Sequence, residues 1–82
     1  MMSNYLNLNN RKIRRSVISK LNSLGYKLDK SSSIRQIEEI IKTIQLNNGK
    51  KADGRIGGAT IGLLYSYDEI MEWFYSDYPT FY

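Results

Sequence analysis

Four acidic side chains near the C-terminus are the residues best suited to acid–base chemistry: Asp68, Glu69, Glu72 and Asp77. Paired carboxylates can act as general acid and general base without other residue types. The chain has no His and no Cys, which excludes imidazole bases, thiolate nucleophiles and the common soft-metal sites. The helix dipole already favours acidic residues in a first helical turn, which gives Asp68 and Glu69 a structural explanation. We therefore expect no catalytic residues, no metal site and no enzymatic activity.

The glycine-rich stretch Ala52 to Leu64, "ADGRIGGATIGLL", could form either a phosphate-binding loop or a set of turns. A P-loop ends in Lys followed by Ser or Thr and comes after a strand, and this stretch has neither feature. We expect no nucleotide and no other cofactor. Turn chemistry is favoured instead, because Gly54 can adopt a positive φ and the Asp53 side chain can accept hydrogen bonds from amides of its own turn.

Three further residues of this stretch are expected to have structural roles. Gly57 is expected to permit the close approach of a neighbouring helix. Thr60 is placed to satisfy an amide near the start of a helix. Ile56 is expected to point inward and fill the core.

Apolar residues recur at intervals of three and four rather than two, which predicts helices and no strands. Residues 10–24 are expected to form an amphipathic helix whose apolar face carries Ile13, Val17, Ile18, Leu21 and Leu24. A second helix, from residue 34 to the Asn48-Gly49 pair, is expected to bury Ile34, Ile37, Ile40, Ile41 and Ile44. A third helix is predicted to begin near residues 58–60 and a fourth to cover residues 67–76.

Capping residues mark the expected ends of these helices. Asn9 or Asn10 can cap the first helix, and Gly25 can end it in a left-handed conformation. Two capping boxes, Ser33 with Gln36 and Ser66 with Glu69, are expected to start the second and fourth helices.

With 82 residues the chain is long enough for one domain and one small core. The prediction is an all-α fold, a compact three-helix bundle with an added C-terminal helix or aromatic tail. We expect an N-terminal segment at residues 1–8, a helical domain at residues 9–66 and the aromatic addition at residues 67–82.

Three separate motifs resemble the peptidoglycan-binding domain family, a three-helix module attached to bacterial and phage cell-wall hydrolases. Leu24-Gly25-Tyr26 matches the turn after the family's first helix, and Ile44-Gln45 before Gly49 matches the end of the second. The segment from Asp53 to Thr60 matches the family's loop of the form Asp-Gly-x-x-Gly-Pro-x-Thr, with Gly58 in place of Pro. Order, spacing and residue type agree within a span of about fifty residues, from Val17 to Leu64, in the segments 17–28 and 34–64.

This resemblance implies a non-catalytic binding module for bacterial cell-wall peptidoglycan, as part of a phage virion or as a lysis accessory. Tyr26, Arg55 and Tyr65 lie in or beside the matched motifs, so they are the expected ligand-binding residues. Tyrosine and arginine suit the sugar faces and carboxylates of that polymer.

The alternative is a small phage protein that uses the same fold to bind and modulate a host protein. Residues 1–42 carry nine basic and three acidic residues, so this half could meet an acidic partner. The expected interface residues are three arginines of the first helix and three C-terminal aromatics: Arg11, Arg14, Arg15, Trp73, Tyr75 and Tyr78. Nucleic acid is not the expected partner, because the C-terminal half is acidic.

The sequence shows no apolar run of the roughly 18 residues that a membrane span requires and no secretion signal. We expect synthesis in the cytoplasm, followed by action in a virion or at the cell wall after lysis.

Overall fold

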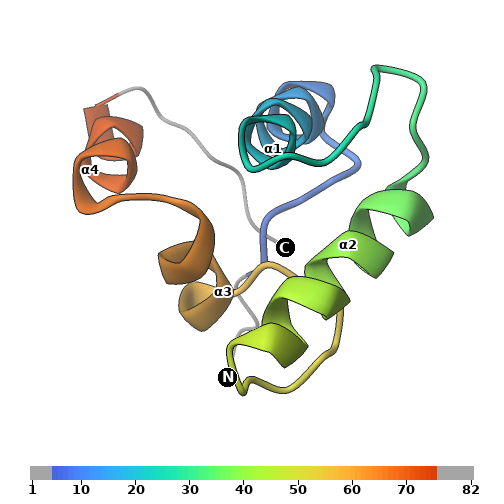
Figure 1. Ribbon diagram of the computed structural model, residues 1–82. Helices are drawn as coiled ribbons and strands as arrows, with labels where there is room; N and C mark the ends of the chain where they lie inside the picture. The colour runs from blue at the N-terminus through green and yellow to red at the C-terminus, as the bar shows by residue number, and fades with distance from the viewer. Residues whose placement is uncertain (1–4, 76–82) are drawn as a thin grey trace.

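A computed structural model describes residues 5–75, with side chains through residue 72. This part of the chain contains four helices and no extended strand (Figure 1). They are α1 (Arg11–Ser23), α2 (Ile34–Asn47), α3 (Gly58–Leu64) and α4 (Tyr67–Tyr75). The predicted all-α class is confirmed. None of the described helices has both the length and the hydrophobicity needed to cross a membrane.

The capping expected at both ends of α1 is confirmed, but one residue of its predicted apolar face is exposed. The Asn10 side chain accepts a hydrogen bond from the backbone N–H of Ile13, and Gly25 has a φ of 104°. Leu24 was expected on the buried face but is 52% exposed. The helix ends at Ser23, so the helical spacing that would have turned Leu24 toward the core stops one residue too early.

The predicted boundaries of α2 are confirmed. Ser33 and Gln36 form both bonds of the capping box, and Gly49 has a φ of 67° just after the C-cap. The buried residues of the helix are Ile37, Ile41, Ile44 and Gln45. Of the five isoleucines expected to be buried, Ile34 and Ile40 are only partly buried. A fully buried glutamine was not expected.

The last two helices are short, and a second capping box lies between them at the start of α4. Gly57 is the N-cap of α3, and no side chain caps that end. Ser66 and Glu69 exchange the two bonds predicted for the start of α4. Glu69 also forms an ion pair with Lys20 of α1, which ties α4 to the first helix.

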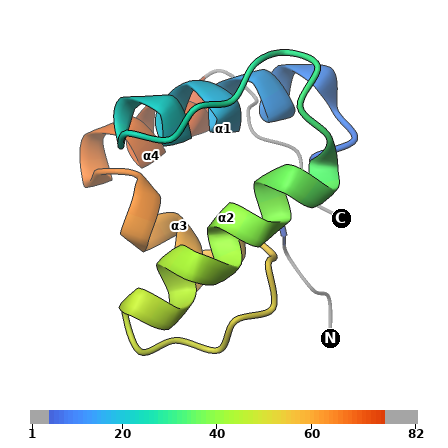
Figure 2. The ribbon, with the colours of Figure 1, turned by 45° about the vertical axis from the view of Figure 1, so that its right-hand side comes forward.

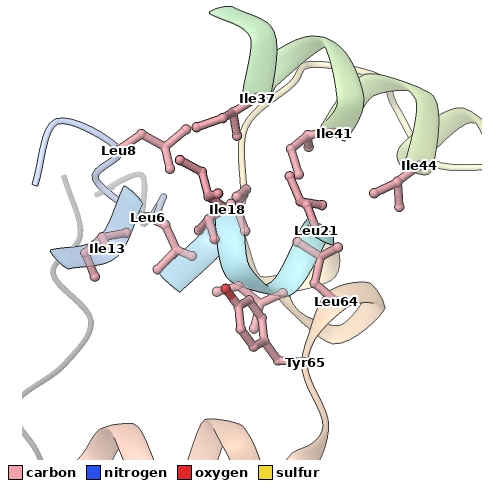
Figure 3. Packing of buried hydrophobic residues seen from close by; sticks show 13 residues of the cluster. Leu6, Leu8, Ile13, Ile18, Leu21, Ile37, Ile41, Ile44, Leu64 and Tyr65 are labelled. Carbon is pink, nitrogen blue, oxygen red and sulfur yellow. The ribbon is translucent and has the colours of Figure 1, made fainter. Parts of the chain in front are cut away.

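The core receives buried side chains from the residues before α1, from α1, α2 and α3, and from Ile56 and Tyr65 on either side of α3 (Figure 3). Tyr26 and Leu28 of the α1–α2 loop and Ile70 of α4 are partly buried and pack against this core. Leu6 and Leu8, from the expected N-terminal segment 1–8, are 3% and 4% exposed and belong to this core. The Leu6 backbone N–H donates to the Ile56 carbonyl at 3.0 Å, so residues before α1 pair with the loop before α3. Ile56 itself is 1% exposed, as expected.

Candidate ligand-binding loop

Gln45, in the last turn of α2, organises the loop between α2 and α3. Its side chain is buried, and the residue is 2% exposed. Its Nε2 group contacts three acceptors, namely Asp53 Oδ1 at 3.0 Å, the Arg55 carbonyl at 3.0 Å and Thr60 Oγ1 at 2.9 Å. Its Oε1 atom accepts from the Gly54 backbone N–H at 2.9 Å. One amide therefore fixes the whole turn from inside the molecule.

Asp53 completes the turn in the way that the sequence predicted. Its Oδ1 atom accepts from the Arg55 backbone N–H at 2.9 Å as well as from Gln45. Partial burial would by itself raise the pKa of Asp53, but the hydrogen bonds from Arg55 and Gln45 outweigh it and hold that pKa below its ordinary value. Asp53 is therefore ionised at neutral pH.

Gly54 has the predicted positive φ, 75°, and it also lies against α2. A Cβ atom at this position would be 3.2 Å from the Glu38 carbonyl oxygen and 3.3 Å from Lys42 Cε. A close approach to a neighbouring helix, the role that we expected of Gly57, is thus seen at Gly54. Gly57 has extended backbone at the N-cap of α3, and its own close approach stays a prediction. Thr60 is buried and accepts from a side-chain amide, that of Gln45, rather than capping α3.

A hollow of about 270 Å³ opens on the outer side of this turn. It is lined by Tyr5, Gln45, Lys50, Lys51, Asp53, Arg55, Gly57, Gly58, Ala59 and Thr60. We call it the loop hollow. Of the described residues, three cationic side chains and one carboxylate border it, and the guanidinium of Arg55 lies 5.3 Å from the centre of the Tyr5 ring. Because Gly57, Gly58 and Ala59 carry little or no side chain, they leave room for a ligand.

The predicted ligand-binding residues occupy three different environments. Arg55 is exposed and lines the loop hollow. Tyr65 is 7% exposed and packs in the core, with Lys20 Nζ 5.2 Å from its ring centre, so its position does not suit contact with a polymer. Tyr26 is half-buried against the core. Neither tyrosine lines the loop hollow.

The structure adds residues that the motif did not indicate. Tyr5, Lys50 and Lys51 border the loop hollow although they lie outside the matched Asp53–Thr60 segment. Gln45 was part of the matched pattern without an assigned role. Its burial could have been predicted from its position, because Gln45 is four residues after the buried Ile41 and therefore lies on the same face of the helix.

The three arginines predicted as a partner interface lie together on α1. Arg11, Arg14 and Arg15 line a second hollow of about 300 Å³ with Ile18 and with Lys30 of the α1–α2 loop. The predicted aromatic part of that interface lies outside the described residues: Tyr78 entirely, Trp73 and Tyr75 by their side chains.

Two of the acidic residues weighed for catalysis, Asp68 and Glu69, lie in the first turn of α4, where the helix dipole favours them. The pKa of Glu69 is lowered by the hydrogen bond from Lys20 and by the one from the Ser66 backbone N–H. This carboxylate is therefore charged, and its ion pair with Lys20 joins α4 to α1. Asp77 lies outside the described residues. Within the described part of the chain, no three His, Cys, Asp or Glu residues cluster in a way that could hold a metal ion.

The chain matched no family model, no curated protein and no solved structure with which it was compared. The resemblance to peptidoglycan-binding domains therefore depends on the order and spacing of its three motifs, and a function must be argued from the geometry of its surface.

Proposed function

We propose that this chain is a non-catalytic binding module for bacterial cell-wall peptidoglycan, and that the loop hollow is its ligand site. The observation that carries the proposal is the combination of Arg55, Lys50, Lys51 and Tyr5 around one hollow beside a turn that Gln45 holds rigid. In this proposal the described helices form the family's three-helix module, with α4 as an addition.

The chemistry of the hollow suits this polymer. The stem peptides of peptidoglycan end in carboxylates, which guanidinium and ammonium groups bind with charge-assisted hydrogen bonds. The glycan strand offers sugar faces that can pack on a tyrosine ring, whose body is apolar and whose tip is polar. Asp53 is the one carboxylate that the described residues place in the hollow, and it can accept hydrogen bonds from sugar hydroxyls or peptide amides.

The internal hydrogen bonds of the turn support binding by limiting its flexibility. Asp53 Oδ1 and the Arg55 carbonyl both accept hydrogen bonds from Gln45 Nε2. The backbone that carries Arg55 is therefore fixed before any ligand binds. A site that is ordered in advance loses less conformational entropy on binding.

Retention on purified peptidoglycan sacculi tests the proposal. The triple variant Lys50→Gln, Lys51→Gln, Arg55→Gln should bind at least about tenfold more weakly than the wild type, because two lost charge-assisted bonds alone exceed 1.4 kcal/mol. A control with the same loss of net charge, Arg11→Gln, Arg15→Gln, Lys30→Gln, should bind within about twofold of the wild type.

Two outcomes would contradict the proposal. One is a folded wild-type protein, verified by a cooperative thermal transition, that sacculi do not retain at low salt. The other is equal weakening in both triple variants, which would attribute retention to net charge rather than to the loop hollow.

A further inference from the structure

The basic hollow on α1 continues into a groove. A second hollow of about 310 Å³ shares Arg15, Ile18 and Lys30 with the first and extends past Asn22 and Leu28. We call the two together the α1 groove. From Arg11 to Asn22 it follows about 16 Å of helix, at 1.5 Å per residue. In Figure 2 the α1–α2 loop runs alongside α1. Leu28, Asp29 and Lys30 of this loop line the groove opposite the residues of α1.

Both walls of the α1 groove are fixed by hydrogen bonds. The Asn22 side chain donates to the Leu28 carbonyl at 2.9 Å and accepts from the Leu28 N–H at 2.8 Å. The next turn is closed by Asp29, which accepts from the Ser31 N–H at 2.8 Å and from the Ser31 hydroxyl at 2.6 Å. Lys30 thus reaches the groove from an ordered turn, while Arg14 on the opposite wall donates to the Leu8 carbonyl at 3.0 Å.

The charges at the basic end work against the stability of α1. Arg11 is three residues from Arg14 and four from Arg15, spacings at which like charges on a helix repel each other. The first turn of α1 contains no acidic residue, although the helix dipole favours acids there. Local conflicts of this kind are expected where a surface is shaped by function. An anionic ligand would relieve the repulsion.

The two ends of the α1 groove differ in charge, and this difference favours one class of ligand. Of the described residues, four cations and no carboxylate line the first hollow, whereas beyond Arg15 and Lys30 the lining is neutral except for Asp29. A nucleic acid carries phosphates at regular intervals and would meet Asp29 at the far end. Among the residues whose side chains the structure describes, no aromatic one lines either hollow to stack on a base.

We propose that the α1 groove binds an extended protein segment that places two or more carboxylates at the basic end and neutral residues along Asn22 and Leu28. Arg11, Arg15 and Lys30 receive the carboxylates. Ile18 supplies an apolar contact at the middle of the groove. This site is separate from the loop hollow and does not depend on the function proposed for it.

Fluorescence anisotropy with a labelled octapeptide tests the proposal. The peptide carries four consecutive acidic residues followed by four neutral ones, and an isomer with glutamine in place of the acids is the ligand control. Arg11→Gln, Arg15→Gln, Lys30→Gln should weaken binding of the acidic peptide at least about tenfold. Lys50→Gln, Lys51→Gln, Arg55→Gln, with the same net charge, should change it less than about twofold.

A second readout distinguishes a binding groove from a structural cluster. Because the like charges repel, Arg11→Gln, Arg15→Gln should raise the thermal midpoint of the protein while it lowers peptide affinity. The proposal is overturned if the wild type does not bind the acidic peptide, if both triple variants lose affinity equally, or if an oligothymidylate of eight nucleotides binds α1 more tightly than the peptide does.

Discussion

Gln45→Leu is expected to lower the free energy of unfolding by about 2 to 4 kcal/mol. Leucine fills a similar volume but can neither donate to Thr60 Oγ1 and the Arg55 carbonyl nor accept from the Gly54 N–H. Each buried polar group left without a partner costs about 1 to 3 kcal/mol, and the loop can recover part of this by turning toward water. A domain of this size has a total stability of about 4 to 12 kcal/mol, so the loss is a large fraction of it.

Thermal unfolding measures this effect, with a fall in midpoint of about 10 to 20 °C for such a loss. Gln36→Leu is the matched control, because it makes the same chemical change at the only other glutamine of the chain. Gln36 is exposed and supplies one bond of a capping box, so its replacement should cost about 0.5 to 1 kcal/mol. Equal midpoints for the two variants would show that Gln45 does not hold the loop.

Gly54→Ala is expected to cost about 2 to 3 kcal/mol, clearly more than Gly49→Ala. Both glycines have a positive φ, 75° and 67°, so alanine is strained by about 1 kcal/mol or more at either position. Only at Gly54 does a Cβ atom also meet a neighbour, the Glu38 carbonyl oxygen at 3.2 Å; at Gly49 nothing lies within 4 Å. The difference between the two variants therefore measures the contact between the turn and α2.

Urea unfolding of the two alanine variants gives this difference directly. Hydrogen exchange adds local information, because the Gly54 N–H is bonded to Gln45 in the wild type and the corresponding amide should exchange faster in Gly54→Ala. A Gly54→Ala variant as stable as Gly49→Ala would contradict the packing of the turn against α2.

The ends of the helices could be predicted because their signals are local. Asn10, the Ser33–Gln36 pair and the Ser66–Glu69 pair each form bonds within three residues of chain, so their types and spacing carried the information. Gly25 and Gly49 likewise mark conformations that other residues rarely adopt. The all-α class follows from the spacing of apolar residues between these ends.

The site was less predictable because its contacts join residues far apart in the chain. The Gln45 side chain donates a hydrogen bond to Thr60, fifteen residues away, and the sequence around Gln45 does not indicate that partner. Tyr5 meets Arg55 because residues before α1 pair with the loop at Ile56. Tyr65 was expected as a ligand residue because it lies beside the matched motifs, yet directly after the short α3 it packs in the core.

Lys30 illustrates the same limit on the other surface. The three arginines of α1 were recognised from one helical segment, but the cation that completes their hollow comes from the α1–α2 loop. Its position depends on the Asn22–Leu28 and Asp29–Ser31 bonds, which only the folded loop shows.

The central claim, that the loop hollow is a peptidoglycan site, is tested most directly by NMR titration of the ¹⁵N-labelled protein with a soluble disaccharide–tetrapeptide fragment of the polymer. We predict saturable shifts of the backbone amides of Lys50, Lys51, Arg55 and Ala59, with the amides of Arg11, Arg15 and Lys30 unchanged. Saturable shifts confined to the α1 groove, or no saturable shift at millimolar fragment, would contradict the claim.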